Sequence, residues 1–432
     1  MERIKMSMLI KNGLVIDPTN KIEAVMDVLV ENGVIAAVDG HIEPSGGHEI
    51  IDASGMWIVP GLIDMHVHFR EPGQEYKETI KTGAEAAARG GFTAVCCMAN
   101  TVPPIDNEFL VEYIKSKARD VPIHILQAGS ATRGMEGTWL SNIGMMAEAG
   151  ISAISEDGKT VADAGLFRAA LKYAAGFNLP VLCHCEDMKL AGAGSMNAGN
   201  AAALLGLGGI PAIAEELIIA RDIMLAEDTG CRLHIQHVST ANGIRIIKEA
   251  KARGVNVTCE ATPHHFTLCD ADIKDYDTNF KMSPPLRGRA DMEAIKQALA
   301  DGTVDCIASD HAPHSADDKN VEFSSAANGI SGLETALPLA LTELYHTGII
   351  SSARLVELMS ANPARILGFA GGSLAVGKAA DITIINPDAE YKIDVCSFRS
   401  KGKNSPFDCR PVKGRAERTI RAGKTIYREN VC

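Results

Sequence analysis

Residues 61–70 read Gly-Leu-Ile-Asp-Met-His-Val-His-Phe-Arg, a short apolar run that closes on two histidines. An apolar run of this length before a polar loop predicts a buried β-strand. Side chains two positions apart on a strand point to the same side, so His66 and His68 share one face. The run therefore predicts a strand that presents two imidazole groups at its carboxyl end.

Seven further short apolar runs follow this strand, and helical stretches separate them. The runs cover residues 93–98, 123–128, 151–155, 181–183, 232–236, 255–258 and 305–308. Helix signals between them include Asp106, which we predict as the N-cap of a helix starting at residue 108. Eight strands alternating with helices predict an α/β fold, a (β/α)8 TIM-type barrel over residues 61–370. A doubly wound sheet is the alternative, but the Gly-x-Gly-x-x-Gly turn that follows the first strand of such sheets is missing here.

Both ends of the chain show the period-two alternation of β-strands. The alternating runs are residues 9–16, 25–30 and 34–38 near the N-terminus and 380–385 and 419–427 near the C-terminus. Asn32-Gly33 between two of these runs is a strong hairpin signal. Each end alone is too small to bury a face of its sheet. We therefore predict one small, β-sandwich-like domain built from residues 1–60 and 371–432.

The composition excludes several classes of protein. The chain of 432 residues carries 42 Lys and Arg against 54 Asp and Glu, a formal net charge of −12. A nucleic-acid binder is excluded, because affinity for phosphates needs a basic surface. The sequence shows no signal peptide and no apolar run of about 18 residues, which predicts a cytoplasmic protein without a membrane partner. Eleven irregularly spaced cysteines predict reduced thiols.

In a (β/α)8 barrel the functional residues lie where each strand ends and the next loop begins. Five of the predicted strands end on residues that bind metals: His66, His68, Asp157, His184, His237 and Asp310. Any one of them alone is better explained as a capping, turn or core residue. Their joint occurrence at strands one, four, five, six and eight indicates a metal site, because imidazole nitrogens and carboxylate oxygens would converge at one mouth.

Some residues near these strand ends have alternative interpretations. Cys183 and Cys185 flank His184, but strand alternation turns them to the opposite face, so we predict that they pack in the core. His264-His265 follows the seventh strand and either lines the mouth or has a structural role. Residues 186–209 and 315–327 are either mobile lids or ordered loops.

Nine motifs combine along the chain. They are His66-Val-His-Phe-Arg-Glu-Pro-Gly, Met98-Ala-Asn-Thr, Ser155-Glu-Asp-Gly, His184-Cys-Glu-Asp, His234-Ile-Gln-His-Val-Ser-Thr, Thr262-Pro-His-His, Pro284-Pro-Leu-Arg, Ala308-Ser-Asp-His-Ala-Pro-His and Gly329-Ile-Ser-Gly-Leu-Glu-Thr. Together they resemble the dihydroorotases of the long bacterial type, a family of the amidohydrolase superfamily. The resemblance covers almost the whole chain, and its motifs are specific in combination.

The resemblance implies one or two Zn²⁺ ions per chain, with two favoured. His66 and His68 would bind one zinc, and His184 and His237 would bind the second. Asp157 would bridge the two metals, at a position where many relatives carry a carboxylated lysine. Zinc, manganese and cobalt all accept such ligands, so the identity of the metal and the occupancy of the second position stay open.

The resemblance also implies the reaction, the reversible cyclisation of N-carbamoyl-L-aspartate to (S)-dihydroorotate in de novo pyrimidine (UMP) biosynthesis. Hydrolysis of the ring amide needs a strong nucleophile, and zinc lowers the pKa of a bound water from 15.7 to about 7. Asp310 would bind the first metal and act as general acid and base toward the zinc-bound hydroxide and the ring nitrogen.

For the small-molecule substrate, the resemblance implies contacts from His68, Arg70, Asn100, Ser283, His314, Asn328 and Gly329. Arg70 offers the planar fork that matches a carboxylate, and its alternative is a surface salt bridge, for instance with Glu71. The family commonly has Asn at the position of Ser283, and Pro-Phe-Gly where this chain has Ala327-Asn328-Gly329. Both departures lie in substrate loops and leave the predicted metal ligands untouched.

Two rival functions share these features in part. An allantoinase or a hydantoinase would have the same barrel and metals but a different ring as substrate. A non-catalytic dihydroorotase-like subunit that scaffolds aspartate carbamoyltransferase would lack metal ligands, whereas all six positions are filled here. A homodimer is the commonest assembly and our expectation, with association with aspartate carbamoyltransferase as an open alternative.

Overall fold

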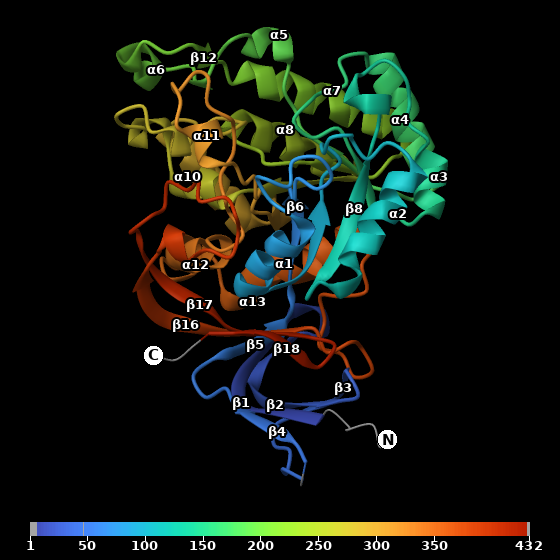
Figure 1. The fold of residues 1–432 in the computed structure, drawn as a ribbon, viewed down its shortest axis with the longest axis vertical. Coiled ribbons are helices and arrows are strands. Elements are labelled where there is room, and N and C mark those ends of the chain that lie inside the picture. The colour runs from blue at the N-terminus through green and yellow to red at the C-terminus, as the bar shows by residue number, and fades with distance from the viewer. Residues whose placement is uncertain (1–6, 46, 430–432) are drawn as a thin grey trace.

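The computed structural model of the chain describes residues 7–45 and 47–429 and contains two large β-sheets (Figure 1). One sheet forms a barrel from the middle of the chain. The other, which we call the terminal sheet, combines strands from both ends, drawn in blue and in red. In this view the barrel lies above the terminal sheet.

Eight parallel strands form the barrel, and each pairs with its neighbours in chain order. They are β6 (Leu62–Val67), β7 (Phe92–Cys97), β8 (His124–Ser130), β9 (Ala153–Ser155), β10 (Val181–Cys183), β13 (Leu233–Ile235), β14 (Val257–Ala261) and β15 (Cys306–Ile307). The ring closes where Val67 pairs with His311, and the His68 N–H donates to the His311 carbonyl at 2.8 Å. The predicted α/β barrel is confirmed, and every predicted run overlaps an observed strand.

Helices cover the outside of the barrel, and shorter helices lie in its connecting loops (Figure 1). They are α1 (Ile80–Arg89), α2 (Glu108–Lys117), α3 (Ile143–Glu148), α4 (Ala164–Gly176), α5 (Met188–Ala191), α6 (Asn200–Leu205), α7 (Ile213–Thr229), α8 (Ala241–Ala252), α9 (Pro263–Thr267), α10 (Arg289–Asp301), α11 (Ala316–Lys319), α12 (Ala336–Ala340), α13 (Ser352–Val356) and α14 (Asn362–Leu367). Both loops that the sequence left open contain short helices, α5 and α6 in the first and α11 in the second. Within the described ranges, no helix is long and apolar enough to cross a membrane.

The predicted cap of α2 is wrong by one residue. The helix begins after Asn107, whose side-chain oxygen accepts a hydrogen bond from the Leu110 N–H at 3.2 Å. Asp106 instead accepts from the Gly134 N–H at 2.9 Å. Asp and Asn cap helices equally well, so the composition could not distinguish them and the path of the loop decides.

The terminal sheet has the order β18-β17-β16-β5-β1-β2-β3, with β4 beside β1. Its strands are β1 (Ser7–Asp17), β2 (Ile22–Glu31), β3 (Val34–Asp39), β4 (Glu49–Asp52), β5 (Trp57–Pro60), β16 (Ile382–Lys392), β17 (Pro411–Arg421) and β18 (Lys424–Arg428), and a separate pair joins β11 (Met196–Asn197) to β12 (Gly209–Ile210). The hairpin at Asn32-Gly33 is present between β2 and β3. The two ends of the chain meet where β5 pairs with β16, as the alternation at both ends predicted. The domain limits, residues 1–60 with 371–432 and residues 61–370, stay a prediction.

The terminal sheet covers the amino ends of the first barrel strands. Gly91, directly before β7, lies so close to Thr383 and Ala416 that an added Cβ would stand 3.0 and 3.1 Å from their side chains. Trp57 of β5 packs edge-on against Tyr345 at 4.8 Å between ring centroids. Because this packing occupies the amino ends, the carboxyl ends of the strands are left free for a functional site.

Candidate metal centre

The carboxyl ends of the barrel strands bring the predicted metal ligands together. His66, His68 and Asp157 form one group whose ligand atoms all lie within 4.8 Å of one another, and Asp157, His184 and His237 form a second. All five side chains are buried. We call these five residues the ligand cluster, and Asp157 is the member that both groups share.

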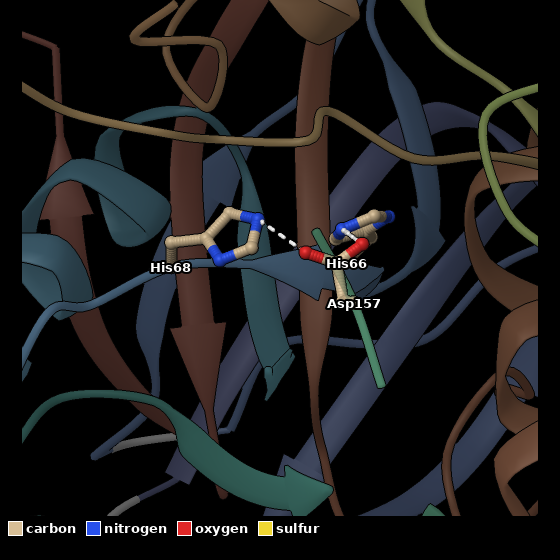
Figure 2. A group of neighbouring side chains, drawn as sticks. All are labelled: His66, His68 and Asp157. Carbon is tan, nitrogen blue, oxygen red and sulfur yellow. Dashed lines mark ion pairs between the residues drawn. The ribbon is translucent and has the colours of Figure 1, made fainter. Parts of the chain in front are cut away.

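Asp157 lies between the two pairs of histidines. Figure 2 shows the rings of His66 and His68 turned toward its two oxygens, with His66 Nε2 3.2 Å from Oδ1 and His68 Nε2 3.4 Å from Oδ2. His237 Nε2 approaches Oδ1 from the second group at 3.6 Å. His184 Nδ1 lies 3.0 Å from His237 Nε2. The arrangement is consistent with two cation sites that share one carboxylate.

Asp310, in the loop after β15, lies beside the first group. Its Oδ1 lies 3.0 Å from His68 Nε2 and 3.5 Å from His66 Nε2. The backbone at Asp310 and at His237 is left-handed, with φ of 46° and 33°. Non-glycine residues adopt this conformation at a cost of about 1–3 kcal/mol, and such strain concentrates at functional sites.

The cluster fits divalent cations. Among the described residues, His66 Nε2, Asp157 Oδ1, His184 Nε2 and His237 Nδ1 are buried side-chain atoms without a hydrogen-bond partner. A buried polar atom left unsatisfied costs about 1–3 kcal/mol, so these atoms are suited to bind a cation. Imidazole nitrogens with carboxylate oxygens are donors that zinc and similar metals accept. The residues are therefore consistent with a binuclear metal site.

The charges in the cluster support this assignment. Burial disfavours ionisation of Asp157, but His66 and His237 beside it outweigh burial and hold the pKa of this carboxyl well below its usual value. The pKa of Asp310 is likewise low despite burial, because of His66 and its hydrogen bond with His68. Burial also disfavours the cationic form of His66, yet Asp157 and Glu260 raise its pKa well above the ordinary value. Without a metal, both carboxylates are ionised and His66 carries a proton.

Glu260 is a functional residue that the sequence analysis missed. Its Oε1 accepts a hydrogen bond from His66 Nδ1 at 2.6 Å, and its Oε2 lies 3.1 Å from His234 Nε2. Metal-binding histidines commonly donate their second N–H to such a carboxylate, which fixes the ring and its tautomer. Glu260 thereby turns His66 Nε2 toward Asp157. The predicted seventh strand, residues 255–258, ended before this residue. The observed strand β14 continues to residue 261 and places Glu260 inside the barrel.

The neighbouring ambiguous residues are now placed. His265 has a structural role, because its Nε2 donates to the Pro284 carbonyl at 3.0 Å and its Nδ1 lies 2.7 Å from Thr262 Oγ1. Burial lowers the pKa of His264 to about 4, so its ring is neutral. Cys183 and Cys185 lie in the hydrophobic core outside both ligand groups, as predicted.

A pocket of about 220 Å³ opens beside the ligand cluster. All the predicted substrate residues line it, namely His68, Arg70, Asn100, Ser283, His314, Asn328 and Gly329. Asn100 also contacts two residues of the ligand cluster. Its Oδ1 lies 2.8 Å from His68 Nδ1, and its Nδ2 donates to Asp157 Oδ2 at 3.2 Å. Asn100 therefore orients two members of the ligand cluster as well as facing the pocket.

Comparisons with known proteins agree with this geometry. Residues 55–243 match the family model described as "Dihydro-orotase-like". The chain is 49% identical to a dihydroorotase of Trichlorobacter lovleyi, over 98% of this chain and 99% of that one. It is 50% identical to a dihydroorotase of Pelotomaculum thermopropionicum, over 99% of this chain and 100% of that one.

Solved structures of related hydrolases share the fold. An L-hydantoinase (dihydropyrimidinase) from Arthrobacter aurescens superimposes with a TM-score of 0.89 at 27% identity, over 98% of this chain and 96% of that one. A D-hydantoinase (dihydropyrimidinase) from Thermus sp. superimposes with a TM-score of 0.83 at 26% identity, over 98% and 95% of the two chains.

Proposed function

The chain belongs to the dihydroorotase family, and from this premise we propose that it interconverts N-carbamoyl-L-aspartate and (S)-dihydroorotate with two zinc ions in the ligand cluster. The observation that carries the proposal is the pair of ligand groups that share Asp157 beside a pocket lined by Arg70 and His314. When bound, the metals would acidify a water molecule and polarise the ring carbonyl.

We assign the proton transfers to Asp310. Its carboxylate is ionised, lines the pocket and lies 3.0 Å from His68 Nε2, at the edge of the ligand cluster. In hydrolysis it accepts a proton from the attacking water and returns that proton to the leaving ring nitrogen. In cyclisation the same carboxyl group acts in the reverse order. Asp157 stays ionised throughout, because it is hydrogen-bonded by Asn100 and surrounded by imidazoles.

We assign recognition of the substrate carboxylate to Arg70 and His314. The Arg70 side chain is partly buried at the pocket wall, and its Nη2 lies 3.4 Å from His314 Nε2. A guanidinium binds a carboxylate through two parallel hydrogen bonds, which sets the orientation of the ring relative to the metals. This local positive charge explains how a chain with a net charge of −12 can bind an anion.

Metal analysis and turnover of three rings test the proposal. We expect zinc in the purified enzyme and the fastest turnover with dihydroorotate, compared with allantoin and hydantoin. Complete removal of metal should abolish activity, and added zinc should restore it. Faster hydrolysis of hydantoin would favour the activity of the Arthrobacter structural relative, and activity that survives complete metal removal would contradict the metal-dependent reaction.

We further propose that the chain acts in the cytoplasm as a homodimer, with the outer face of α7 in the interface. Ile213, Leu217 and Met224 are 49%, 48% and 68% exposed, and their spacing places them on one side of this helix. Exposed apolar stripes mark interaction surfaces. Light scattering should show a dimer that Leu217→Glu converts to a monomer. A monomeric wild type would contradict this, and a complex formed only with added aspartate carbamoyltransferase would identify that enzyme as the partner.

A further inference from the structure

Lys77 is a buried lysine that contacts the substrate pocket only through another residue. Its side chain lies in the loop between Arg70 and α1 and is 8% exposed. Its Nζ lies 3.3 Å from His314 Nδ1 and 3.2 Å from Asp318 Oδ1. His314 lines the pocket, whereas Lys77 is absent from the lining residues. A buried ammonium group at this place needs an explanation, because burying a charge is costly unless it is paired.

The contacts of His314 determine which of its nitrogens carries the proton. An ammonium group can only donate hydrogen bonds, so His314 Nδ1 must accept from Lys77. The second nitrogen, Nε2, lies 2.8 Å from the Asn328 carbonyl, which can only accept. Both neighbours therefore select the tautomer in which Nε2 carries the hydrogen.

The same ring stays neutral in this environment. Burial, Arg70 and Lys77 together lower the pKa of His314 to about 2. A neutral imidazole has one donor and one acceptor, so its tautomer decides whether it offers a hydrogen or a lone pair to the pocket. A lone pair directed at a carboxylate would repel it.

We propose that Lys77 is a positioning residue for substrate binding: it holds His314 in the tautomer that carries a hydrogen on Nε2. This hydrogen bonds to the Asn328 carbonyl in the free protein and is the donor that the substrate carboxylate would share when it enters the pocket. The inference rests on the proposed function of His314 and names a residue that acts behind it.

The geometry at Arg70 supports this role. Arg70 Nη2 and His314 Nε2 lie 3.4 Å apart, and in this tautomer both are donors, so they cannot bond to each other. Two donors side by side at a pocket wall match the two lone-pair-rich oxygens of a carboxylate. The ring of dihydroorotate carries one such group.

The competing explanation is that Lys77 only forms an ion pair with Asp318. Asp318 has its own structural task, since its Oδ2 accepts from the N–H and the hydroxyl of Ser315 at 2.9 and 2.6 Å at the start of α11. Asp318→Asn keeps one oxygen that can accept from Ser315 but removes the charge opposite Lys77. It therefore separates the ion pair from the contact with His314.

The decisive experiment is ¹⁵N NMR of the zinc-loaded, substrate-free enzyme labelled in its histidines. The signals of His314 are identified by their loss in His314→Gln. We expect the Nε2–H pattern in the wild type, in Lys77→Arg and in Asp318→Asn, and a new Nδ1–H population in Lys77→Met. A Lys77→Met protein with unchanged His314 signals would overturn the proposal. Because no substrate is present, this result is independent of whether dihydroorotate is the substrate.

Kinetics supply the second readout. Lys77→Met should raise KM for dihydroorotate about tenfold while kcat changes less than twofold, because a lost hydrogen bond to the carboxylate weakens binding alone. In the His314→Gln background the same substitution should leave KM unchanged. Lys81→Met, at an exposed lysine four residues away, is the matched control. An equal rise in KM with and without His314 would contradict an effect transmitted through that ring. If Lys77→Met does not fold, Lys77→Gln takes its place in both measurements.

Discussion

The two sides of the substrate pocket are built differently. On the metal side, ligands at the ends of the barrel strands are held by side chains of other strand-end residues, as Glu260 holds His66 and Asn100 holds His68. On the carboxylate side, Arg70 and His314 come from loops and contact backbone carbonyls, at 3.3 Å to Pro313 and 2.8 Å to Asn328. In the proposed function, strand-end residues therefore hold the metals and loop residues bind the substrate carboxylate. Substitutions on the two sides should therefore separate kcat and metal content from KM.

The largest effect is expected at Asp310, on the metal side. Asp310→Asn keeps the size of the side chain but removes the base, so kcat should fall about 10³-fold, within the range of general acid–base catalysis. KM for dihydroorotate should change little, because the carboxylate contacts lie on the other side. Steady-state kinetics with metal analysis of the same samples measure both. Asp317→Asn, at an exposed position nearby, is the control, and a kcat within tenfold of wild type would remove Asp310 from its assigned role.

The next largest effect is expected on metal affinity, when Glu260, which orients the ligand His66, is substituted. Glu260→Gln replaces a charged acceptor by a neutral one, and substitutions of this kind cost about 10–100-fold in metal affinity. We expect the upper end of this range, because Glu260 serves both His66 and His234. Competition with a chelator measures the affinity. Glu249→Gln removes only an exposed ion pair with Arg245 and should leave it unchanged; equal affinities in both variants would contradict the role of Glu260.

On the carboxylate side, Arg70→Lys should act on binding alone. A lysine keeps the charge but loses the planar fork, so KM should rise about 30-fold, which corresponds to one charged hydrogen bond of about 2 kcal/mol. The metal content and kcat should remain near wild type. A fall in kcat with unchanged KM would show that the two sides are not separable. Arg168→Lys, which alters an exposed pair with Asp228, is the control.

The smallest change is a gradual dependence of metal binding on pH. His66 carries a proton in the metal-free cluster, because Asp157 and Glu260 outweigh burial and raise its pKa. A ligand imidazole must be neutral, so metal uptake releases this proton. The apparent affinity should therefore rise with pH, by up to about tenfold per unit for one proton, and metal-dependent activity should fall in acid. Calorimetry in two buffers of different ionisation enthalpy counts the proton, and uptake without release would contradict the assignment.

The sequence revealed the parts of the site that local patterns encode. Strand ends and ligand chemistry are both local, so His66, His68 and Asp157 could be recognised from a few residues around each. Glu260 acts on a residue 194 positions away, and Lys77 on one 237 positions away. No local pattern records such pairs, because they form only when the strands and loops are brought together. The prediction of Asp106 as the helix cap failed for the same reason.

The pairing of β5 with β16 joins two segments that are synthesised at very different times. Residues 382–385 of β16 pair with residues 57–60 of β5. Between β5 and β6, the Gly61 N–H donates to the Asp381 carbonyl at 2.9 Å, and β6 begins at the next residue. During synthesis on the ribosome, the partner of β5 is therefore produced more than 300 residues after it. Until then the strand that carries His66 lacks the neighbour that anchors its start. The start of this strand is therefore anchored by a segment that is translated near the end of the chain.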